Sequence, residues 1–393
     1  MKICAVVSEY NPFHNGHLYH LNEIKKRSLC DTLICIMSGD YTQRGEIAML
    51  NKYQRARHAI LGGADMVIEL PTVFATAPAE IFASGAIKLL SEIPAVEMLS
   101  FGCEKGTKET FLSTAKALLT ETKEFKNQLK EELKGGKSLA KAKADAIKAL
   151  SIEGVDLELL DTPNSILGIE YTKAILSLNS KIDILPIERI GGGYNDTKVY
   201  NNFSSASSIR ESIKFRNKKA VKHNVPSFVY KDIDYVLPEA DDYIFYSLLT
   251  RKTVEMASVM DCSEGLENRI KALMKDSLSL NELIEKITTK RYTKARIKRI
   301  CMSVFLNINE EFVRKCLKND LYLKVLGISD KRMDLLSEIK NTCKLPLLTR
   351  KSDYRLLNDF QTECFDKDTE AGDIYNYITK QKNNEHIMPI VKI

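Results

Sequence analysis

Several features that mark specialised classes of protein are missing from this sequence. It has no run of 18 or more apolar residues, so a membrane-spanning helix is not expected. With 10 Pro and 18 Gly in 393 residues, it is neither collagen-like nor disordered. Its nine cysteines form no CxxC pair, which argues against a zinc motif and predicts reduced thiols in a cytoplasmic protein. The first apolar run ends at Val7, too early for a signal-peptide core.

Positive charge is in excess only in the second half of the chain. Residues 1–210 contain 25 basic and 25 acidic side chains, so the whole net charge of +6 lies in residues 211–393. A local excess of this kind is compatible with a polyanionic partner such as a nucleic acid. Ordinary surface charge explains it equally well without further observations.

The first 210 residues alternate short apolar runs with helical patterns. Five runs predict buried strands: Lys2–Ser8, Thr32–Met37, Asp65–Glu69, Val96–Phe101 and Lys181–Pro186. Helical spacing of apolar residues predicts helices over Gly16–Arg27, Asn51–Leu61, Pro78–Leu90 and Pro163–Ser177. Near-continuous apolar strands that alternate with helices are typical of a parallel sheet covered on both faces. The predicted fold class is therefore α/β, with a Rossmann-like doubly wound parallel sheet.

The rest of the chain reads as mostly helical. Lys105–Leu150 is rich in Lys and Ala and predicts two helices broken at Gly135 and Gly136. From Ala240 onward, strand patterns thin out and amphipathic helices dominate. We therefore expect two domains, with residues 1–215 forming the α/β domain and residues 216–393 forming a mainly helical, basic domain.

The strongest chemical signal is the segment Glu9–His17, which follows the first predicted strand and opens the first predicted helix. This junction of an open α/β sheet is where such folds hold nucleotides. The helix N-terminus offers free N–H groups to a phosphate, and Gly16 removes a side chain from its path. His14 and His17 can donate hydrogen bonds to phosphate oxygens. Two surface histidines at a helix cap are the plainer alternative.

The pattern HxGH formed by His14, Gly16 and His17 resembles the signature of nucleotidylyltransferases and class I aminoacyl-tRNA synthetases. The longer string EYNPFHNGHLYHL, residues 9–21, resembles more narrowly the bacterial tRNA(Met) cytidine acetate ligase family. Other segments that fit this family are Gln43–Glu46, Gly63–Pro71, Ser100–Glu104, Pro163–Tyr171, Glu188–Gly191, Phe203–Arg210 and Lys290–Thr293.

The resemblance implies an ATP-dependent ligase. Such an enzyme converts ATP and acetate to acetyl-adenylate and pyrophosphate, and the wobble cytidine of elongator tRNA(Met) then takes the acetyl group to give N4-acetylcytidine and AMP. Mg²⁺ is expected with the ATP. A small-molecule adenylyltransferase or carboxylate–amine ligase is the alternative enzyme, although a small substrate needs no basic second half. A non-catalytic RNA-binding module is disfavoured because both histidines and Gly16 are present.

The family resemblance also implies which residues bind ATP, with His14 and His17 as the catalytic pair. The expected contacts are Val7, Ser8, Glu9, Tyr10, Asn11, Pro12, Phe13, His14, Asn15, Gly16, His17, Leu18, Tyr19, His20, Gly102, Asn164 and Arg189. Ser207, Ser208 and Arg210 resemble a phosphate-contacting loop of other nucleotidylyltransferases, although the serine hydroxyls could also simply cap a helix. On their residue types alone, Asn164 could be a plain helix cap and Arg189 a surface ion pair.

A second group of residues is expected to bind RNA. Arg291, Tyr292, Arg296 and Arg299 lie in a segment with six cations, where Arg and Lys suit phosphates and Tyr can stack on a base. A solvated helix face is the alternative. Lys52 and Arg55 share a helix face, which could likewise contact RNA or simply face the solvent. Arg44 and Glu46 lie in a loop after the second strand, where they could touch acetate or the nucleotide. A salt bridge in a surface loop is the alternative.

Overall fold

The structure is a computed structural model that describes residues 1–120, 122–137, 139–150, 152, 154–190, 203–382, 385–386 and 390–393. Its strands are β1 (Ile3–Ser8), β2 (Thr32–Ser38), β3 (Met66–Leu70), β4 (Val96–Cys103), β5 (Asp183–Glu188), β6 (Leu323–Ile328), β7 (Leu347–Leu348) and β8 (Val391–Lys392). The helices of the first half are α1 (Asn15–Arg27), α2 (Lys52–Leu61), α3 (Thr72–Ala75), α4 (Ala79–Ser91), α5 (Lys108–Leu119), α6 (Lys123–Lys134), α7 (Leu139–Ala149) and α8 (Pro163–Ser177).

The second half is mainly helical, as expected. Its helices are α9 (Ala206–Lys214), α10 (Lys218–Asn224), α11 (Ser227–Tyr230), α12 (Asp241–Thr250), α13 (Thr253–Ala257), α14 (Leu266–Met274), α15 (Leu280–Ile287), α16 (Lys294–Phe305), α17 (Glu310–Lys318), α18 (Asp334–Thr342) and α19 (Asp359–Ile378). Among the described residues, none of the helices combines the length and the apolar character needed to span a bilayer.

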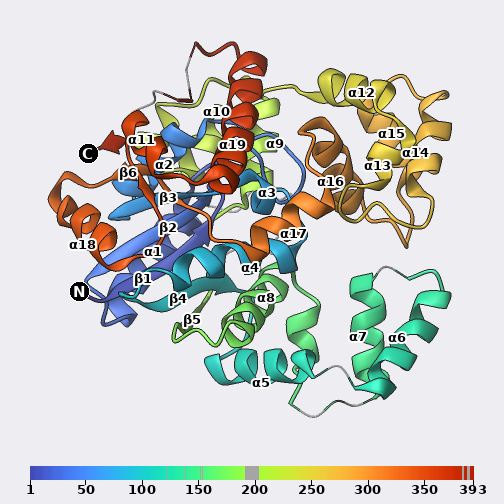
Figure 1. Cartoon of the computed structure of the whole chain (residues 1–393), viewed down its shortest axis with the longest axis horizontal. Helices are drawn as coiled ribbons and strands as arrows, with labels where there is room; N and C mark the ends of the chain where they lie inside the picture. Colours follow the sequence, from blue (N-terminus) through green and yellow to red (C-terminus); the bar gives the residue numbers. More distant parts are fainter. Residues whose placement is uncertain are drawn as a thin grey trace.

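One sheet organises the molecule (Figure 1). In the described residues its order is β5-β4-β1-β2-β3-β6-β7, with β8 beside β6. Strands β1 to β5 are parallel to one another, and Ser8 of β1 pairs in register with Met37 of β2. The carboxyl ends of the central strands therefore meet at one edge, where doubly wound sheets bind ligands. This confirms the predicted fold class.

Both faces of the sheet are covered, as the apolar strand runs predicted. Along β1, Ile3 and Ala5 belong to one buried cluster, whereas Cys4 and Val6 belong to another. Successive side chains of a strand point to opposite faces, so this alternation shows a layer on each side. Each fully buried large aliphatic side chain contributes about 1.5–3 kcal/mol to folding.

The sheet also contains strands from the C-terminal half, which the sequence analysis did not predict. Strand β6 pairs antiparallel with β3, with Met66 opposite Ile328, and β8 pairs with β6. Because few strand patterns were recognised after Ala240, the sequence analysis missed β6, which is buried along its whole length. The division into residues 1–215 and 216–393 stays a prediction, but the sheet draws on both segments.

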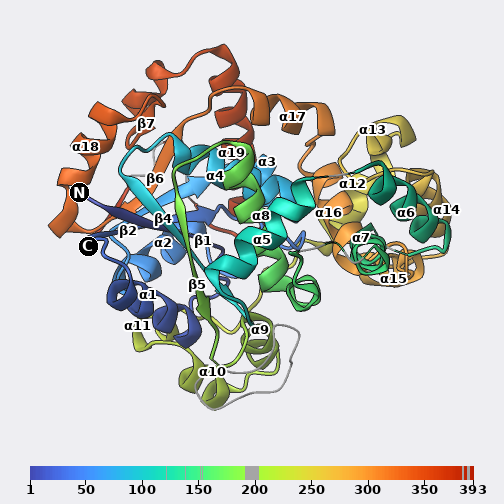
Figure 2. The same cartoon turned by 90° about the horizontal axis from the view of Figure 1, so that it is seen from below.

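Two groups of helices extend from the sheet on the side of α16 (Figures 1 and 2). One group is α12–α16. The other is α5–α7, where Lys105–Leu150 forms three helices and not the expected two. The break at Gly135 and Gly136 is confirmed, and a second break follows Leu119, where Thr122 caps the next helix.

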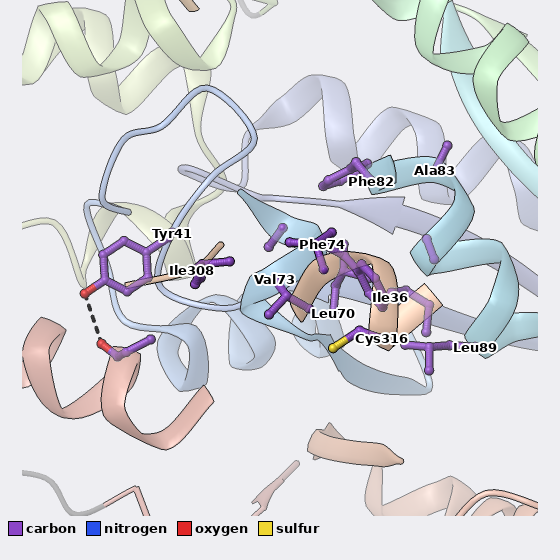
Figure 3. Packing of buried hydrophobic residues seen from close by; sticks show 14 of the residues in the cluster. Ile36, Tyr41, Leu70, Val73, Phe74, Phe82, Ala83, Leu89, Ile308 and Cys316 are labelled. Carbon is purple, nitrogen blue, oxygen red and sulfur yellow. Dashed lines mark hydrogen bonds between the residues drawn. The ribbon is translucent and has the colours of Figure 1, made fainter. Parts of the chain in front are cut away.

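Residues of the C-terminal half complete the core beneath the sheet (Figure 3). Ile308 and Cys316 are buried in the same cluster as Val73 and Phe74 of α3. The hydroxyl of Tyr41, which follows β2, donates a hydrogen bond to the carbonyl of Ala371 in α19 at 3.0 Å. The loop after β2 is thereby held between the sheet and α19.

Candidate active site

A cavity of about 210 Å³ lies at the carboxyl edge of the sheet. Its walls come from the ends of β1, β4 and β5, the start of α1, the loop after β2 and the loop before α9. Predicted site residues on its walls are Val7, Ser8, Glu9, Tyr10, Asn11, His14, Gly16, His17, Tyr19, His20, Gly102, Asn164, Arg189 and Arg210. Segments that are far apart in the sequence thus meet at the place where the sequence analysis predicted nucleotide binding.

The two signature histidines cap α1 with their own rings. His14 Nδ1 accepts a hydrogen bond from the N–H of Gly16 at 3.0 Å, and His17 Nδ1 accepts one from the N–H of His14 at 3.2 Å. The rings stack with centroids 3.7 Å apart. Because each Nδ1 is an acceptor, the proton of each neutral ring is on Nε2. Both rings are therefore Nε2–H donors.

Burial keeps these imidazoles neutral in the free protein. It lowers the pKa of His14 to about 3, with the Arg189 guanidinium adding to the effect. The pKa of His17 is lowered for the same main reason, reinforced by His14. An anion bound beside the rings raises these pKa values again. Before a nucleotide binds, the histidines thus act as dipolar donors.

Phe13 supports the signature loop from below. Its side chain is fully buried and fills the space above Gly62, where a Cβ atom would lie 2.4 Å from the ring. Asn11 Oδ1 accepts a hydrogen bond from the N–H of Met49 at 2.9 Å. Among the predicted contacts, Pro12, Phe13, Asn15 and Leu18 are not on the cavity wall. These residues shape the loop, and Asn15 Nδ2 donates to the carbonyl of His223 at 2.9 Å.

Gly102, Asn164 and Arg189 meet at the β4–β5 end of the cavity. A Cβ atom on Gly102 would lie 3.3 Å from Arg189 Cγ, so this end has little space for a side chain. Asn164 Nδ2 donates to Glu104 Oε1 at 2.5 Å, which fixes the amide. Gly191, which ends the motif begun by Glu188, lies outside the described residues.

The two serines expected to contact phosphate lie in different places. Ser208 is buried inside α9 and is absent from the cavity wall, whereas Ser207 lies on that wall. Ser205 Oγ caps the helix by accepting from the N–H of Ser208 at 3.1 Å. Position 208 is the third residue of α9, so its side chain faces the core. Arg210 NH1 donates to the carbonyl of Asn11 at 2.8 Å, so it also holds the signature loop.

The loop Thr42–Glu46 contributes more than the sequence indicated. Glu46 pairs with Arg210 of α9 at 3.1 Å and with Lys298 of α16 at 2.6 Å. Gly45 has φ +71°, and a Cβ atom there would lie 2.5 Å from the Lys298 carbonyl carbon. Only glycine fits both the conformation and the close approach. This loop therefore joins α16 to the cavity.

Lys52 and Arg55 do not reach RNA, nor do they form a solvated face. Arg55 is fully buried and donates to the carbonyl groups of Glu9 (2.7 Å) and Ser38 (3.1 Å). Lys52 is buried among carboxylates and lies 2.9 Å from Glu69. The two cations bind the ends of β1, β2 and β3 together from inside the protein. Helical spacing alone did not distinguish a buried face from an exposed one.

The predicted RNA-binding residues lie beside a second, larger cavity of about 730 Å³. Arg291, Arg296 and Arg299 are on its wall, and the Arg296 guanidinium lies 5.3 Å from the Tyr292 ring centroid. Arg291 pairs with Glu264, and Arg299 pairs with Asp261 at 3.3 Å. Residues of α6 and α7 form the opposite wall. Gln43 lies on the walls of both cavities.

Comparison with known proteins agrees with this geometry. The sequence profile described as HIGH Nucleotidyl Transferase matches residues 1–388. A tRNA(Met) cytidine acetate ligase of Thermoanaerobacter sp. is 37% identical over 407 aligned positions, covering 100% of both chains. One of Acetivibrio thermocellus is 38% identical and covers 90% of this chain and 89% of its own.

Solved structures show the same similarity. The apo crystal structure of Thermotoga maritima TmcAL matches with a TM-score of 0.93 at 32% identity, covering 100% of both chains. The structure of Thermotoga maritima TmcAL bound with alpha-thio ATP matches with a TM-score of 0.90 at 31% identity, again over both whole chains.

Proposed function

This chain belongs to the HIGH nucleotidyl transferase family, and on that premise we propose that it is a tRNA(Met) cytidine acetate ligase. It joins acetate to ATP, forming acetyl-adenylate and pyrophosphate. It then transfers the acetyl group to the wobble cytidine of elongator tRNA(Met), giving N4-acetylcytidine and AMP. The proposal is supported by similarity over the full length of ligases with that name and by a matching structure that binds an ATP analogue.

The observation that carries the proposal is the donor pair formed by His14 and His17. Both rings direct Nε2–H groups from the N-terminus of α1, where the helix dipole favours a phosphate. When acetate oxygen attacks the α-phosphorus, negative charge builds on the equatorial oxygens. Preorganised donors stabilise that charge without having to reorient. Each such donor contributes about 10²–10³ in rate.

Other cavity residues take the remaining parts of ATP. Gly102, Asn164 and Arg189 suit the nucleoside end, while Ser207 and Arg210 at the start of α9 suit the departing pyrophosphate. Mg²⁺ would neutralise the phosphates. The described residues group no three His, Cys, Asp or Glu side chains for a metal ion, so phosphates and water would supply most ligands.

The RNA fits the second cavity. Arg291, Tyr292, Arg296 and Arg299 would hold the anticodon loop, with residues 216–393 contributing most of this surface and residues 1–215 the catalysis. The target base must leave the stack to reach the adenylate. The enzyme would act on tRNA in the cytoplasm, without a membrane.

Two measurements test the function. Purified protein with ATP, acetate and elongator tRNA(Met) is expected to give N4-acetylcytidine, AMP and pyrophosphate in equal amounts. Nucleoside mass spectrometry of tRNA from cells that lack the protein is expected to show loss of N4-acetylcytidine and of no other modification. If both tRNA pools are identical and the purified protein transfers no acetyl group, the proposal is wrong.

A further inference from the structure

The first cavity has two distinct ends. Gly102, Asn164 and Arg189 form the end at β4 and β5, whereas Glu9 and Gln43 form the end at β1 and the loop after β2. Gln43 also lies on the wall of the second cavity, together with the three arginines proposed to bind RNA. A base that passed from the second cavity to the first along Gln43 would meet Glu9, whose carboxylate accepts the Gln43 N–H.

Acetyl transfer to a cytidine requires a proton acceptor at that end. The exocyclic N4 amine becomes positively charged when it attacks a carbonyl carbon, and the product amide is neutral. One proton must therefore leave the nitrogen. A positioned base that takes it contributes about 10²–10⁴ in rate.

The signature histidines are poorly suited to this role. His14 Nδ1 and His17 Nδ1 already accept backbone N–H groups, and their Nε2 atoms carry protons. His20 Nε2 donates to Ser100 Oγ, because that hydroxyl itself donates to the Leu185 carbonyl. Its remaining nitrogen is a weak base, since burial and Arg189 lower the pKa of His20 to about 4.

The carboxylates of the cavity differ in their partners. Glu46 uses one oxygen for Lys298 and the other for Arg210. Glu9 Oε1 accepts the N–H of Gln43 at 2.7 Å, and among the residues that the structure describes its Oε2 accepts no hydrogen bond. Glu188 also lies on the wall, but it is exposed and belongs to β5, two strands away from β1. Glu9 is therefore fixed at one oxygen and open at the other.

We propose that the Glu9 carboxylate is the general base of the acetyl-transfer step. This inference rests on the proposed function. The cytidine N4 lone pair forms a bond to the acetyl carbonyl carbon, the proton on N4 passes to Glu9 Oε2, and the bond from that carbon to the bridging phosphate oxygen breaks. AMP leaves with the electron pair of that bond. No oxidant or other reactant is needed.

The surroundings of Glu9 give it suitable basicity. Burial raises the pKa of Glu9 above its usual value, while the Gln43 N–H and the arginines 210, 55 and 44 oppose this rise. The Glu9 carboxylate is thus a stronger base than that of an exposed glutamate. A base improves as its pKa approaches the working pH.

The test separates the two half-reactions of the protein. Glu9→Gln keeps the acceptor oxygen for the Gln43 N–H but removes the base. Acetate-dependent exchange of pyrophosphate into ATP measures the adenylation step, and single-turnover transfer to tRNA is expected to fall about 10²–10⁴-fold beyond any change in that exchange. Hydroxylamine, a stronger nucleophile, should still capture the acetyl group from the adenylate. Glu9→Asp should transfer at an intermediate rate.

Each contrary result has a definite meaning. Equal loss of exchange and transfer in Glu9→Gln would make Glu9 a residue that only positions ATP, and unchanged transfer would exclude it as the base. Selective loss of transfer in Glu188→Gln or His20→Asn would assign the base elsewhere. Absence of acetate-dependent exchange in the wild-type protein would instead overturn the proposed function, so the two failures are distinguishable. Thermal melting of each variant checks that it folds.

Discussion

Lys298 Nζ lies 2.6 Å from Glu46 Oε1, and this ion pair joins positions 252 residues apart in the sequence. The other oxygen of Glu46 pairs with Arg210, which in turn donates to the carbonyl of Asn11 in the signature loop. A continuous series of polar contacts therefore runs from α16, beside the proposed RNA cavity, to the loop that carries the histidines.

Removing Lys298 is expected to weaken tRNA acetylation without abolishing ATP binding. In Lys298→Met, Glu46 keeps Arg210 but the Thr42–Glu46 loop loses its polar tie to α16. A charged hydrogen bond of this kind contributes about 1.5–3 kcal/mol, so kcat/KM for tRNA should fall about tenfold or more. Lys315→Met, which removes an exposed ion pair with Glu311 within α17, is the control. Equal effects of the two variants would contradict the prediction.

His14→Asn separates helix capping from catalysis. Asn Oδ1 can replace His14 Nδ1 as the acceptor for the Gly16 N–H, so thermal stability should stay close to wild type. The Nε2–H donor is lost, and acetate-dependent pyrophosphate exchange should fall about 10²–10³-fold. His14→Ala should lose the same activity and in addition about 1 kcal/mol of stability. An active Asn variant would show that only the cap matters.

Arg296 should contribute more to RNA affinity than Arg291. The Arg296 guanidinium donates to the carbonyl of Asp261 and lies over the Tyr292 ring, and no carboxylate of the described residues forms an ion pair with it. Arg291, by contrast, is paired with Glu264. Arg296→Gln is expected to weaken tRNA binding and to reduce the slope of log K against log salt by about 0.9. Lys340→Gln on α18 removes the same charge far from this surface and is the control. Filter binding across a salt series measures both quantities.

Glu69 should make the folded state sensitive to acid. It is buried and lies 2.9 Å from Lys52 and 3.0 Å from Lys324. Although burial opposes ionisation, the two lysines lower the pKa of Glu69 from 4.5 to about 2. A carboxyl group with a depressed pKa stabilises the fold above pH 4.5, and this contribution disappears as pH falls towards 2.

Glu69→Gln is therefore expected to cost about 3–5 kcal/mol at neutral pH, because two buried lysines lose a partner. The cost should shrink as pH falls from about 5 to 2. Urea unfolding at several pH values measures it. Asp40 has the opposite effect on the free energy of unfolding. Burial raises its pKa from 3.8 to about 6, so its contribution to stability is lost as the pH rises through that range. A pH-independent cost in Glu69→Gln would show that packing, not charge, explains the loss.

The sequence predicted the first five strands because each is a short apolar run bounded by helical patterns. Strand β6 was missed for two reasons. Its run Leu323–Ile328 is interrupted by Lys324 and Gly327, and it stands among amphipathic helices. Its partner β3 is far away in sequence, and local patterns do not specify which distant segments pair. Lys324 is tolerated there because Glu69 lies beside it.

The signature segment was predicted because it is local: His14, Gly16 and His17 lie within one turn. Arg55 was not assigned to the site, although it lies beneath it. Its role depends on the carbonyl groups of Glu9 and Ser38, which only the folded sheet brings together. Gln43 lies in a segment that fits the family, but the sequence does not show that this residue lies on the walls of two cavities.

The antiparallel return of β6 has a consequence during synthesis. One edge of β3 has no hydrogen-bonding neighbour until residues 323–328 have left the ribosome, on the order of tens of seconds later at usual elongation rates. In that interval β3, which is apolar and buried in the folded protein, presents unpaired backbone groups to other unfolded chains. The nascent polypeptide therefore has a built-in period of vulnerability to aggregation, during which a chaperone that shields strand edges would be of most use.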